Sequence, residues 1–307
     1  MKHTKSHAKV RKAIFPVGGL GTRFLPATKS MPKEMLPVVD KPLIHYAFEE
    51  ARAAGIEQFI FVTGRNKHSI EDHFDHVYEL QSRLSARDKK KELEQTSDWL
   101  PQAGNISFTR QQEPLGLGHA VWCARHLIGD EPFAVLLADD MVLSKKPCLK
   151  QMVGAYQKTG ANILGVMDVP RAKTSSYGIV DIDAKARTGD ARLVKAKGLV
   201  EKPSPDKAPS TLSIIGRYIL QPEIFDILDK QKPGAGGEIQ LTDAISGMTS
   251  KKGVYGYRFE GTRYDCGSLV GFVAANVAYA LEREEITNVM IDEIEQVFKR
   301  SGHTLCK

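Results

Sequence analysis

No long apolar run occurs in this sequence. A helix that crosses a membrane needs about 18 consecutive apolar residues, and none of the 307 residues begins such a stretch. The opening residues, MKHTKSHAKVRKA, also lack the apolar centre of a secretory signal. These absences argue against a membrane-spanning protein, so we expect a cytoplasmic protein with no membrane partner.

Cysteine is scarce and scattered. The chain has four cysteines, which lie far apart and without the short spacing of metal-binding motifs. Such a pattern indicates reduced thiols, which again favours the cytoplasm. The four are Cys123, Cys148, Cys266 and Cys306.

Acidic residues are missing from the start of the chain, where none precedes Glu34. We interpret residues 1–11 as a solvated basic tail. The alternative is a nucleic-acid-binding arm, but no aromatic residues alternate with the basic ones and no DNA- or RNA-binding motif occurs, so we expect no nucleic-acid partner. The basic residues of this part of the chain are Lys2, Lys5, Lys9, Arg11, Lys12, Arg23, Lys29 and Lys33.

Low-complexity linkers and internal repeats are also absent, which favours one domain with insertions. Apolar segments that predict strands alternate with amphipathic segments that predict helices. This alternation indicates an α/β fold of Rossmann-like type, with an open, mixed, mostly parallel sheet flanked by helices. The expected strands are 12–17, 58–63, 106–111 and 133–138, and the expected helices are 42–54, 74–95 and 118–127.

The second half of the chain changes character. Its apolar segments have shorter connections, which predicts a small antiparallel portion of the sheet. We therefore expect one domain over residues 12–282, followed by a C-terminal helix and tail over residues 283–307. The expected strands are 178–183, 191–202, 211–220 and 253–261, and two helices are expected at 268–281 and 285–299.

Two familiar phosphate-binding motifs are missing as well. The P-loop pattern GxxxxGK[ST] does not occur. The dinucleotide pattern GxGxxG fails because Phe24 stands where the third glycine would follow Gly19 and Gly21. These absences exclude the two commonest nucleotide-binding loops.

The sequence does have PVGGLGTRFLPATKSMPKEMLPV, from Pro16 to Val38, directly after the first expected strand. Its glycines allow a sharp turn and a close approach of the backbone to a ligand. Arg23 and Lys33 would add positive charge beside a bound anion. From the glycines alone, a tight turn with exposed basic residues remains an equal alternative.

Three downstream segments carry polar side chains next to expected strands. The amide of Gln111 offers a donor and an acceptor that match the edge of uracil or thymine, although such residues are usually solvated. Asp139 and Asp140 end an apolar strand, and because neighbouring side chains alternate, only one should face a ligand. Asp265 precedes a helix, where it could ligate Mg²⁺ or cap the helix.

The segments GGLGTR and PKEMLPV together resemble the signature of the sugar-nucleotide pyrophosphorylases, a family of nucleotidyltransferases, and the similarity runs from about residue 12 to 281. The resemblance implies that the glycine loop wraps a nucleoside triphosphate and that Arg23 and Lys33 neutralise its phosphates. It implies that Asp139, with Asp265, holds Mg²⁺ as cofactor. The implied nucleotide-binding residues are Gly18, Gly19, Gly21, Gln111 and Gly116.

The same resemblance implies a sugar-phosphate pocket. Its residues would be Gly178 in SYGIV, Glu201 and Lys202 in VEKP, and, in support, Glu238 in GGEIQLTDAI. Lys202 would hold the sugar phosphate during the reaction. By itself, a Glu-Lys dipeptide indicates only a solvated surface, so these roles depend on the resemblance.

The combination of QQEPLGLGHA, LLADD, VEKP and FEGTRYDCGS is most similar to the bacterial members that use UTP and glucose 1-phosphate. They form UDP-glucose and pyrophosphate by direct displacement, and the resemblance also implies a homodimer or homotetramer. Alternatives are an enzyme that uses dTTP and a non-catalytic, regulatory relative. One departure is Gly18-Gly19 where that subgroup more often has Ala-Gly, a change that should not harm phosphate binding.

Overall fold

The computed structural model describes residues 7–234 and 237–302, so residues 1–6 of the predicted tail and Cys306 lie outside it. The strands of the main sheet are β1 Lys12–Val17, β4 Gln58–Thr63, β5 Ile106–Arg110, β6 Phe133–Leu136, β8 Asn162–Asp168, β9 Gly178–Ile182, β10 Leu193–Glu201, β11 Leu212–Leu220 and β12 Val254–Arg258. Two small ladders pair β2 Pro37–Val38 with β3 Lys41–Pro42, and β7 Asp140–Leu143 with β13 Thr262–Asp265.

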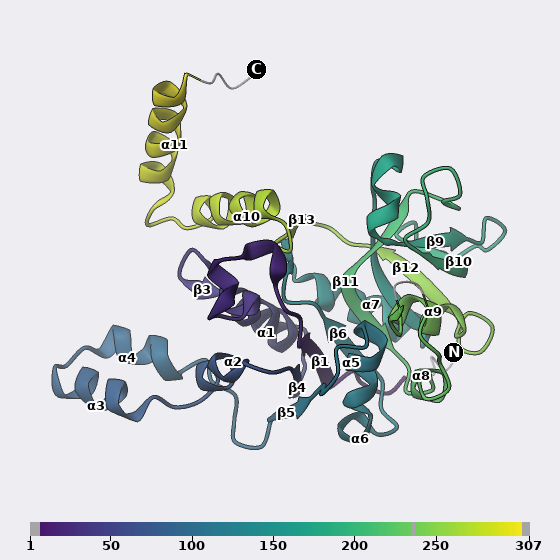
Figure 1. Ribbon diagram of the computed structural model, residues 1–307, viewed down its shortest axis with the longest axis horizontal. Helices are drawn as coiled ribbons and strands as arrows, with labels where there is room; N and C mark the ends of the chain where they lie inside the picture. The colour runs from purple at the N-terminus through teal and green to yellow at the C-terminus, as the bar shows by residue number, and fades with distance from the viewer. Residues whose placement is uncertain (1–6, 235–236, 303–307) are drawn as a thin grey trace, which may run out of the picture.

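Helices cover both faces of this sheet and extend beyond it (Figure 1). In the part of the chain that the structure describes, none of them is long and apolar enough to cross a membrane. They are α1 Leu43–Ala53, α2 His68–His73, α3 Tyr78–Ala86, α4 Lys90–Ser97, α5 Leu117–Cys123, α6 Arg125–Ile128, α7 Cys148–Thr159, α8 Ile224–Leu228, α9 Leu241–Ser246, α10 Leu269–Leu281 and α11 Thr287–Ser301.

The main sheet has the order β5-β4-β1-β6-β11-β8-β12-β10-β9. The α/β class, the mixed sheet and the flanking helices are as predicted, but the sheet is not mostly parallel. The run β5-β4-β1-β6 is parallel, as is β8 with β12. Pairs β6–β11, β11–β8, β12–β10 and β10–β9 are antiparallel. The antiparallel portion is larger than expected because β11, buried along its whole length, enters the centre of the sheet against β6.

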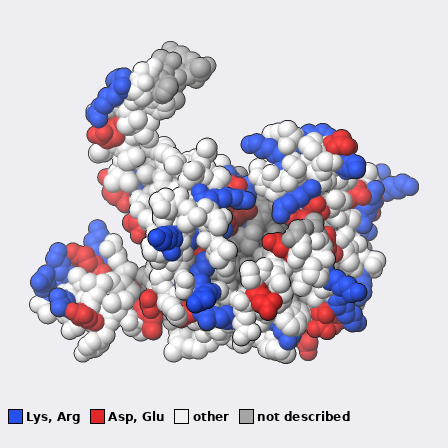
Figure 2. Space-filling view, viewed as in Figure 1, with Lys and Arg blue, Asp and Glu red and all other residues white. Residues whose placement is uncertain are grey.

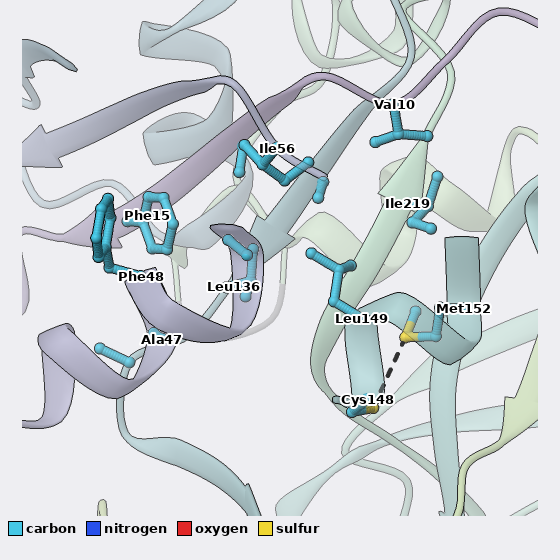
Figure 3. Packing of buried hydrophobic residues seen from close by; sticks show 14 of the residues in the cluster. Val10, Phe15, Ala47, Phe48, Ile56, Leu136, Cys148, Leu149, Met152 and Ile219 are labelled. Carbon is cyan, nitrogen blue, oxygen red and sulfur yellow. Dashed lines mark hydrogen bonds between the residues drawn. The ribbon is translucent and has the colours of Figure 1, made fainter. Parts of the chain in front are cut away.

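Two apolar clusters fill the space on either side of the sheet. Successive residues of β1 point to opposite faces, so Phe15 joins one cluster and Ile14 the other. On the first face Phe15 lies beside Phe48 of α1, and Leu149 of α7 belongs to the same cluster (Figure 3). The second face is covered by α5, α8 and α9. This two-sided core holds the loops that follow β1 and β6 at one edge of the sheet.

Several elements differ from the prediction. The expected helix over 74–95 is two helices, α3 and α4, separated by a turn in which Asp88 has a φ of 51°. They project from the body (Figure 1), which is why their apolar residues stay half-exposed. The expected helix over 118–127 is divided at Ala124 into α5 and α6. The larger elements that were not predicted are helix α7 and strand β8, and the shorter ones are α2, α8, α9, β2, β3, β7 and β13.

The inner end of the basic segment belongs to the folded body. Val10 is buried in the first cluster, where Figure 3 shows it near Ile219. Arg11 forms ion pairs with Glu131 and Glu57. The predicted tail over 1–11 is therefore too long at its carboxyl end.

A pair of histidines beneath the α3–α4 hairpin predicts a loss of stability in acid. Burial, together with the smaller effect of the His45 ring, whose Nδ1 lies 3.0 Å from Nε2 of His73, lowers the pKa of His73 to about 4. An unfolded chain titrates its histidines near pH 6.5. The unfolded state therefore binds a proton that the folded state excludes, so stability falls as the pH drops from about 6.5 to about 4.

We expect His73→Gln to reduce this acid loss by about 1–2 kcal/mol, an amount discounted for partial exposure of the ring. Glutamine keeps a polar atom near the position of Nε2 but does not titrate. Urea unfolding at pH 7 and pH 4.5 measures the effect, with the exposed His68→Gln as control. Equal acid loss in His73→Gln and wild type would contradict the assignment.

Candidate active site

A cavity of about 230 Å³ lies beyond the carboxyl ends of β1 and β6. Acidic and basic side chains lie close together around the hollow on this face of the molecule (Figure 2). Five of the predicted site residues line the cavity, although they are far apart in the sequence. They are Arg23, Asp139, Gly178, Glu201 and Asp265.

The glycine-rich loop after β1 is held by side chains from two other segments. The hydroxyl of Thr28 donates to the carbonyl oxygen of Gly21 at 2.7 Å. The ammonium group of Lys67 donates to the carbonyl oxygen of Gly19 and to the carboxylate of Glu34, both at 2.7 Å. Gly21 has a φ of 66°, a conformation that glycine adopts without strain. These contacts make the loop a preformed turn.

Lys33 and Asp139 form an ion pair, with Nζ 2.5 Å from Oδ2. Burial alone would lower the pKa of Lys33, but the negative charges of Asp139 and Glu34 outweigh it and raise that pKa. Burial would raise the pKa of Asp139, but the charge and hydrogen bond of Lys33 bring it below its usual range. Both side chains are therefore charged in the folded protein.

The β7–β13 ladder brings Asp139 and Asp265 together. Asp140, the first residue of β7, lies opposite Asp265, and the N–H of Cys266 donates to the carbonyl oxygen of Asp139 at 2.7 Å. A Cβ built on Gly267 would lie 3.0 Å from Oδ1 of Asp265 and 3.1 Å from Oδ2 of Asp139. Both carboxylates consequently face one small space.

Two carboxylates that share a space fit Mg²⁺, which takes oxygen ligands and commonly combines one or two carboxylates with substrate phosphates. No group of three or more His, Cys, Asp or Glu side chains is arranged to hold a metal within residues 7–234 and 237–302. Substrate oxygens would have to complete the coordination. The alternative role for Asp265 was to cap the helix that follows it. Ser268 caps this helix, α10, because its Oγ accepts from the N–H of Gly271 at 3.1 Å.

Asp140, Tyr177 and Arg263 also line the cavity and were not predicted as site residues. The Asp140 carboxylate turns away from Asp139 and accepts from the N–H of Gly216 at 2.6 Å and from Nε of Arg263. The guanidinium of Arg263 also donates to the hydroxyl of Tyr177 at 3.0 Å. A signal for Arg263 existed, because it stands two residues before Asp265 and so shares its face of a strand.

Gln111 joins the two glycine segments that were predicted to bind the nucleotide. Its Nε2 donates to the carbonyl oxygen of Gly116 at 3.0 Å, and its Oε1 is 3.1 Å from the place of a Cβ on Gly18. Glu238 lies beside Gly116, where an added Cβ would be 2.8 Å from its own Cβ. It does not line the cavity itself, but Gln240, which does, donates to its carboxylate at 3.1 Å.

The predicted sugar residues meet where β9 and β10 pair, with Gly178 opposite Glu201. A Cβ on Gly178 would lie 2.9 Å from Oγ1 of Thr242 and 3.2 Å from Oε2 of Glu201, so the site has no room for a side chain there. Lys202 follows with a φ of 46°, and its Nζ is 3.3 Å from Oε1 of Glu201. Its exposed side chain lies next to the cavity but does not line it.

The chain is similar to known proteins over most of its length. Residues 12–282 match the family model described as Nucleotidyl transferase. A UTP–glucose-1-phosphate uridylyltransferase of Bacillus subtilis (strain 168) is 50% identical over 292 residues, which cover 95% of this chain and 98% of that protein. One of Staphylococcus epidermidis is 50% identical over 289 residues, 94% of this chain and 99% of the relative.

Solved structures show the same similarity. A UDP-glucose pyrophosphorylase complexed with UDP-glucose has a TM-score of 0.77 and 44% identity, covering 89% of this chain and 100% of its own. A UTP-bound UGPase from Acinetobacter baumannii has a TM-score of 0.84 and 41% identity, covering 93% of this chain and 98% of its own.

Proposed function

Because this chain belongs to the nucleotidyl transferase family, we propose that its cavity transfers the uridylyl group of UTP to glucose 1-phosphate. The products are UDP-glucose and pyrophosphate. The observation that carries the proposal is the convergence of Arg23, Asp139, Asp265 and Glu201 on one cavity. Two polyanions have to meet there, which requires positive charge and oriented polar groups in a partly enclosed space.

The reaction is a direct displacement. A phosphate oxygen of glucose 1-phosphate forms a bond with the α-phosphorus of UTP, while the bond from that phosphorus to the oxygen bridging to the β-phosphorus breaks. Pyrophosphate leaves, so no nucleophilic Ser or Cys is needed. Catalysis then consists of positioning and of stabilising the charge on the phosphates.

The residues divide this work between the two substrates. Arg23 and Lys33 stabilise the charge on the triphosphate and on departing pyrophosphate. Glu201 accepts hydrogen bonds from sugar hydroxyls, and Lys202 holds the sugar phosphate as it attacks. Asp139 and Asp265 are the residues that would hold Mg²⁺, which when bound would neutralise charge on phosphate oxygens of both substrates.

Replacing Lys202 by alanine should affect glucose 1-phosphate and leave UTP binding nearly unchanged. We expect Lys202→Ala to lower kcat/KM for glucose 1-phosphate about 10²-fold, because one cation beside a reacting phosphate is lost. The affinity for UTP should stay within about twofold of wild type, because Lys202 lies beside Glu201 of the sugar pocket and is not part of the glycine loop that is proposed to bind the triphosphate. Steady-state kinetics and UTP titration measure both. The exposed Lys207→Ala is the matched control, and unchanged turnover in Lys202→Ala would remove this role.

The reaction itself is tested by pyrophosphate release with Mg²⁺, glucose 1-phosphate and each of UTP, dTTP, ATP, CTP and GTP. We expect release with UTP. A preference for dTTP would keep the site and change the base that it selects. Folded protein that releases nothing with any nucleotide would support the non-catalytic, regulatory alternative.

Two further features belong to this proposal. A homodimer or homotetramer is supported by valines that stay more than half exposed on α10 and α11, where they would be covered by a second copy. These are Val270, Val273, Val289 and Val297. We also assign the protein to the cytoplasm, where reduced thiols such as the buried Cys148 and Cys266 persist.

A further inference from the structure

Beside the glycine loop, the amide of Gln111 has two partners. Its Nε2 lies 3.0 Å from the carbonyl oxygen of Gly116 and 3.1 Å from Nδ1 of His119 on α5. The other ring nitrogen of His119, Nε2, lies 3.9 Å from Sγ of Cys123. His119 was not selected from the sequence as a site residue.

The chemistry of these groups determines which way the amide points. A backbone carbonyl oxygen only accepts hydrogen bonds, so the NH₂ end of Gln111 has to face Gly116. The second amide hydrogen then points at Nδ1 of His119, which has to accept it. A neutral imidazole with an acceptor at Nδ1 carries its proton on Nε2, where Sγ of Cys123 is the neighbouring acceptor. Burial raises the pKa of the Cys123 thiol, so no thiolate stands beside the ring.

The ring of His119 is also held in place by packing. It stacks on Trp122, with ring centroids 5.7 Å apart and an angle of 20° between planes. The guanidinium of Arg125 in turn lies over the Trp122 ring, 3.5 Å from the ring centre. These contacts favour one orientation of the imidazole and therefore one position for its Nδ1.

Both hydrogens of the Gln111 amide are consequently used inside the protein, and only Oε1 is left for a ligand. This oxygen faces the glycine loop, 3.1 Å from the place of a Cβ on Gly18. An acceptor suits N3–H of uracil, which donates. It repels N3 of cytosine, which accepts.

We propose that His119 is a positioning residue that sets the pyrimidine preference of the site by holding Gln111 with its Oε1 toward the base. The inference rests on the proposed function, in that a pyrimidine nucleotide binds beside Gln111 and the glycine loop. His119 does not line the cavity, and it acts through Gln111.

The test compares two substitutions at His119. His119→Phe keeps an aromatic ring against Trp122 and removes both nitrogens. His119→Asn places an amide oxygen near the position of Nδ1 and keeps an acceptor for Gln111. His126→Phe, at an exposed histidine of α6, is the matched control. Thermal unfolding of each variant is measured first, to establish that all are folded.

Binding of UTP and of CTP is then titrated without glucose 1-phosphate, so that the result does not depend on turnover. We expect His119→Phe to weaken UTP binding about fivefold, the change that one lost neutral hydrogen bond produces, and to narrow the preference for UTP over CTP by a similar factor. In His119→Asn and His126→Phe, the affinity for UTP and the ratio of UTP to CTP affinity should both stay within about twofold of wild type. In turnover, KM for UTP should rise in His119→Phe while kcat changes little.

Two results would overturn the inference. One is an unchanged ratio of UTP to CTP affinity in His119→Phe. The other is an equal loss in His119→Phe and His119→Asn, which would mean that the ring acts by packing alone. Failure of the proposed function would give a different result. Wild-type protein would then bind UTP in preference to CTP but release no pyrophosphate. The proposed reaction would be wrong, and the same titrations would still decide the role of His119.

Discussion

Asp139→Asn is expected to lower kcat for pyrophosphate release by about 10²–10³-fold and to abolish its normal dependence on Mg²⁺ concentration. The substitution removes a carboxylate that shares one small space with Asp265. It also removes the negative charge that keeps the partly buried ammonium group of Lys33 paired. Because the lost carboxylate and the disrupted ion pair both lie at the reacting phosphates, we expect kcat to fall more than KM rises.

The measurement is initial rate against Mg²⁺ concentration at saturating UTP and glucose 1-phosphate. Asp130→Asn, at an exposed aspartate before β6, controls for the loss of one negative charge. If Asp139→Asn kept the wild-type rate and metal dependence, the two carboxylates would not be the metal ligands.

Glu50→Gln is expected to lower the free energy of unfolding by about 3–5 kcal/mol, the usual cost of breaking a buried ion pair from one side. The side chain of Arg217 is 1% exposed and that of Glu50 is 9% exposed. Nε of Arg217 is 3.0 Å from Oε1 of Glu50, and NH2 is 2.8 Å from Oε2. Glutamine would leave the guanidinium charge uncompensated in the interior.

This ion pair also supports the active site from behind. Arg217 donates to the carbonyl oxygens of Leu137 and Gly216, both at 2.9 Å. The N–H of Gly216 in turn donates to the Asp140 carboxylate, beside Asp139. We therefore expect partial loss of activity in Glu50→Gln at temperatures where the protein is still folded.

Urea unfolding measures the stability of this variant. Glu79→Gln, in an exposed pair with Arg83, is the control and should change stability by no more than about 0.5 kcal/mol. The double variant Glu50→Leu with Arg217→Met should lose less than Glu50→Gln, because it leaves no buried charge. A Glu50→Gln protein within about 1 kcal/mol of wild type would show that the pair contributes little.

Local patterns in the sequence were sufficient for the elements around the glycine loop. Strands β1 and β4 have the predicted bounds, and helix α1 differs from its prediction by one residue at each end. Each is a short apolar or amphipathic segment with clear boundaries, so neighbouring residues determine it. The glycine loop and Lys33 follow β1 within the same stretch, which is why their place could be predicted without a fold.

Contacts between segments that are distant in the sequence could not be predicted from these patterns. Asp139 and Asp265 meet only because β7 pairs with β13. A ladder of four residues is too short to be predicted from the spacing of apolar residues. Helix α7 and strand β8 were missed, and with them the antiparallel centre of the sheet. The α3–α4 segment has helical spacing throughout, but its turn at Asp88 interrupts the helix away from the body.

The sequence by itself determined the reaction class, because the glycine loop, Arg23, Lys33 and Asp139 stand in short segments whose chemistry and order are recognisable. Only the tertiary structure decided how these groups are held. Arg263 reaches Asp140 and Tyr177, and His119 orients Gln111, through contacts that depend on strand pairing and helix packing. Such contacts are interactions between side chains brought together by folding, and a local pattern does not contain them.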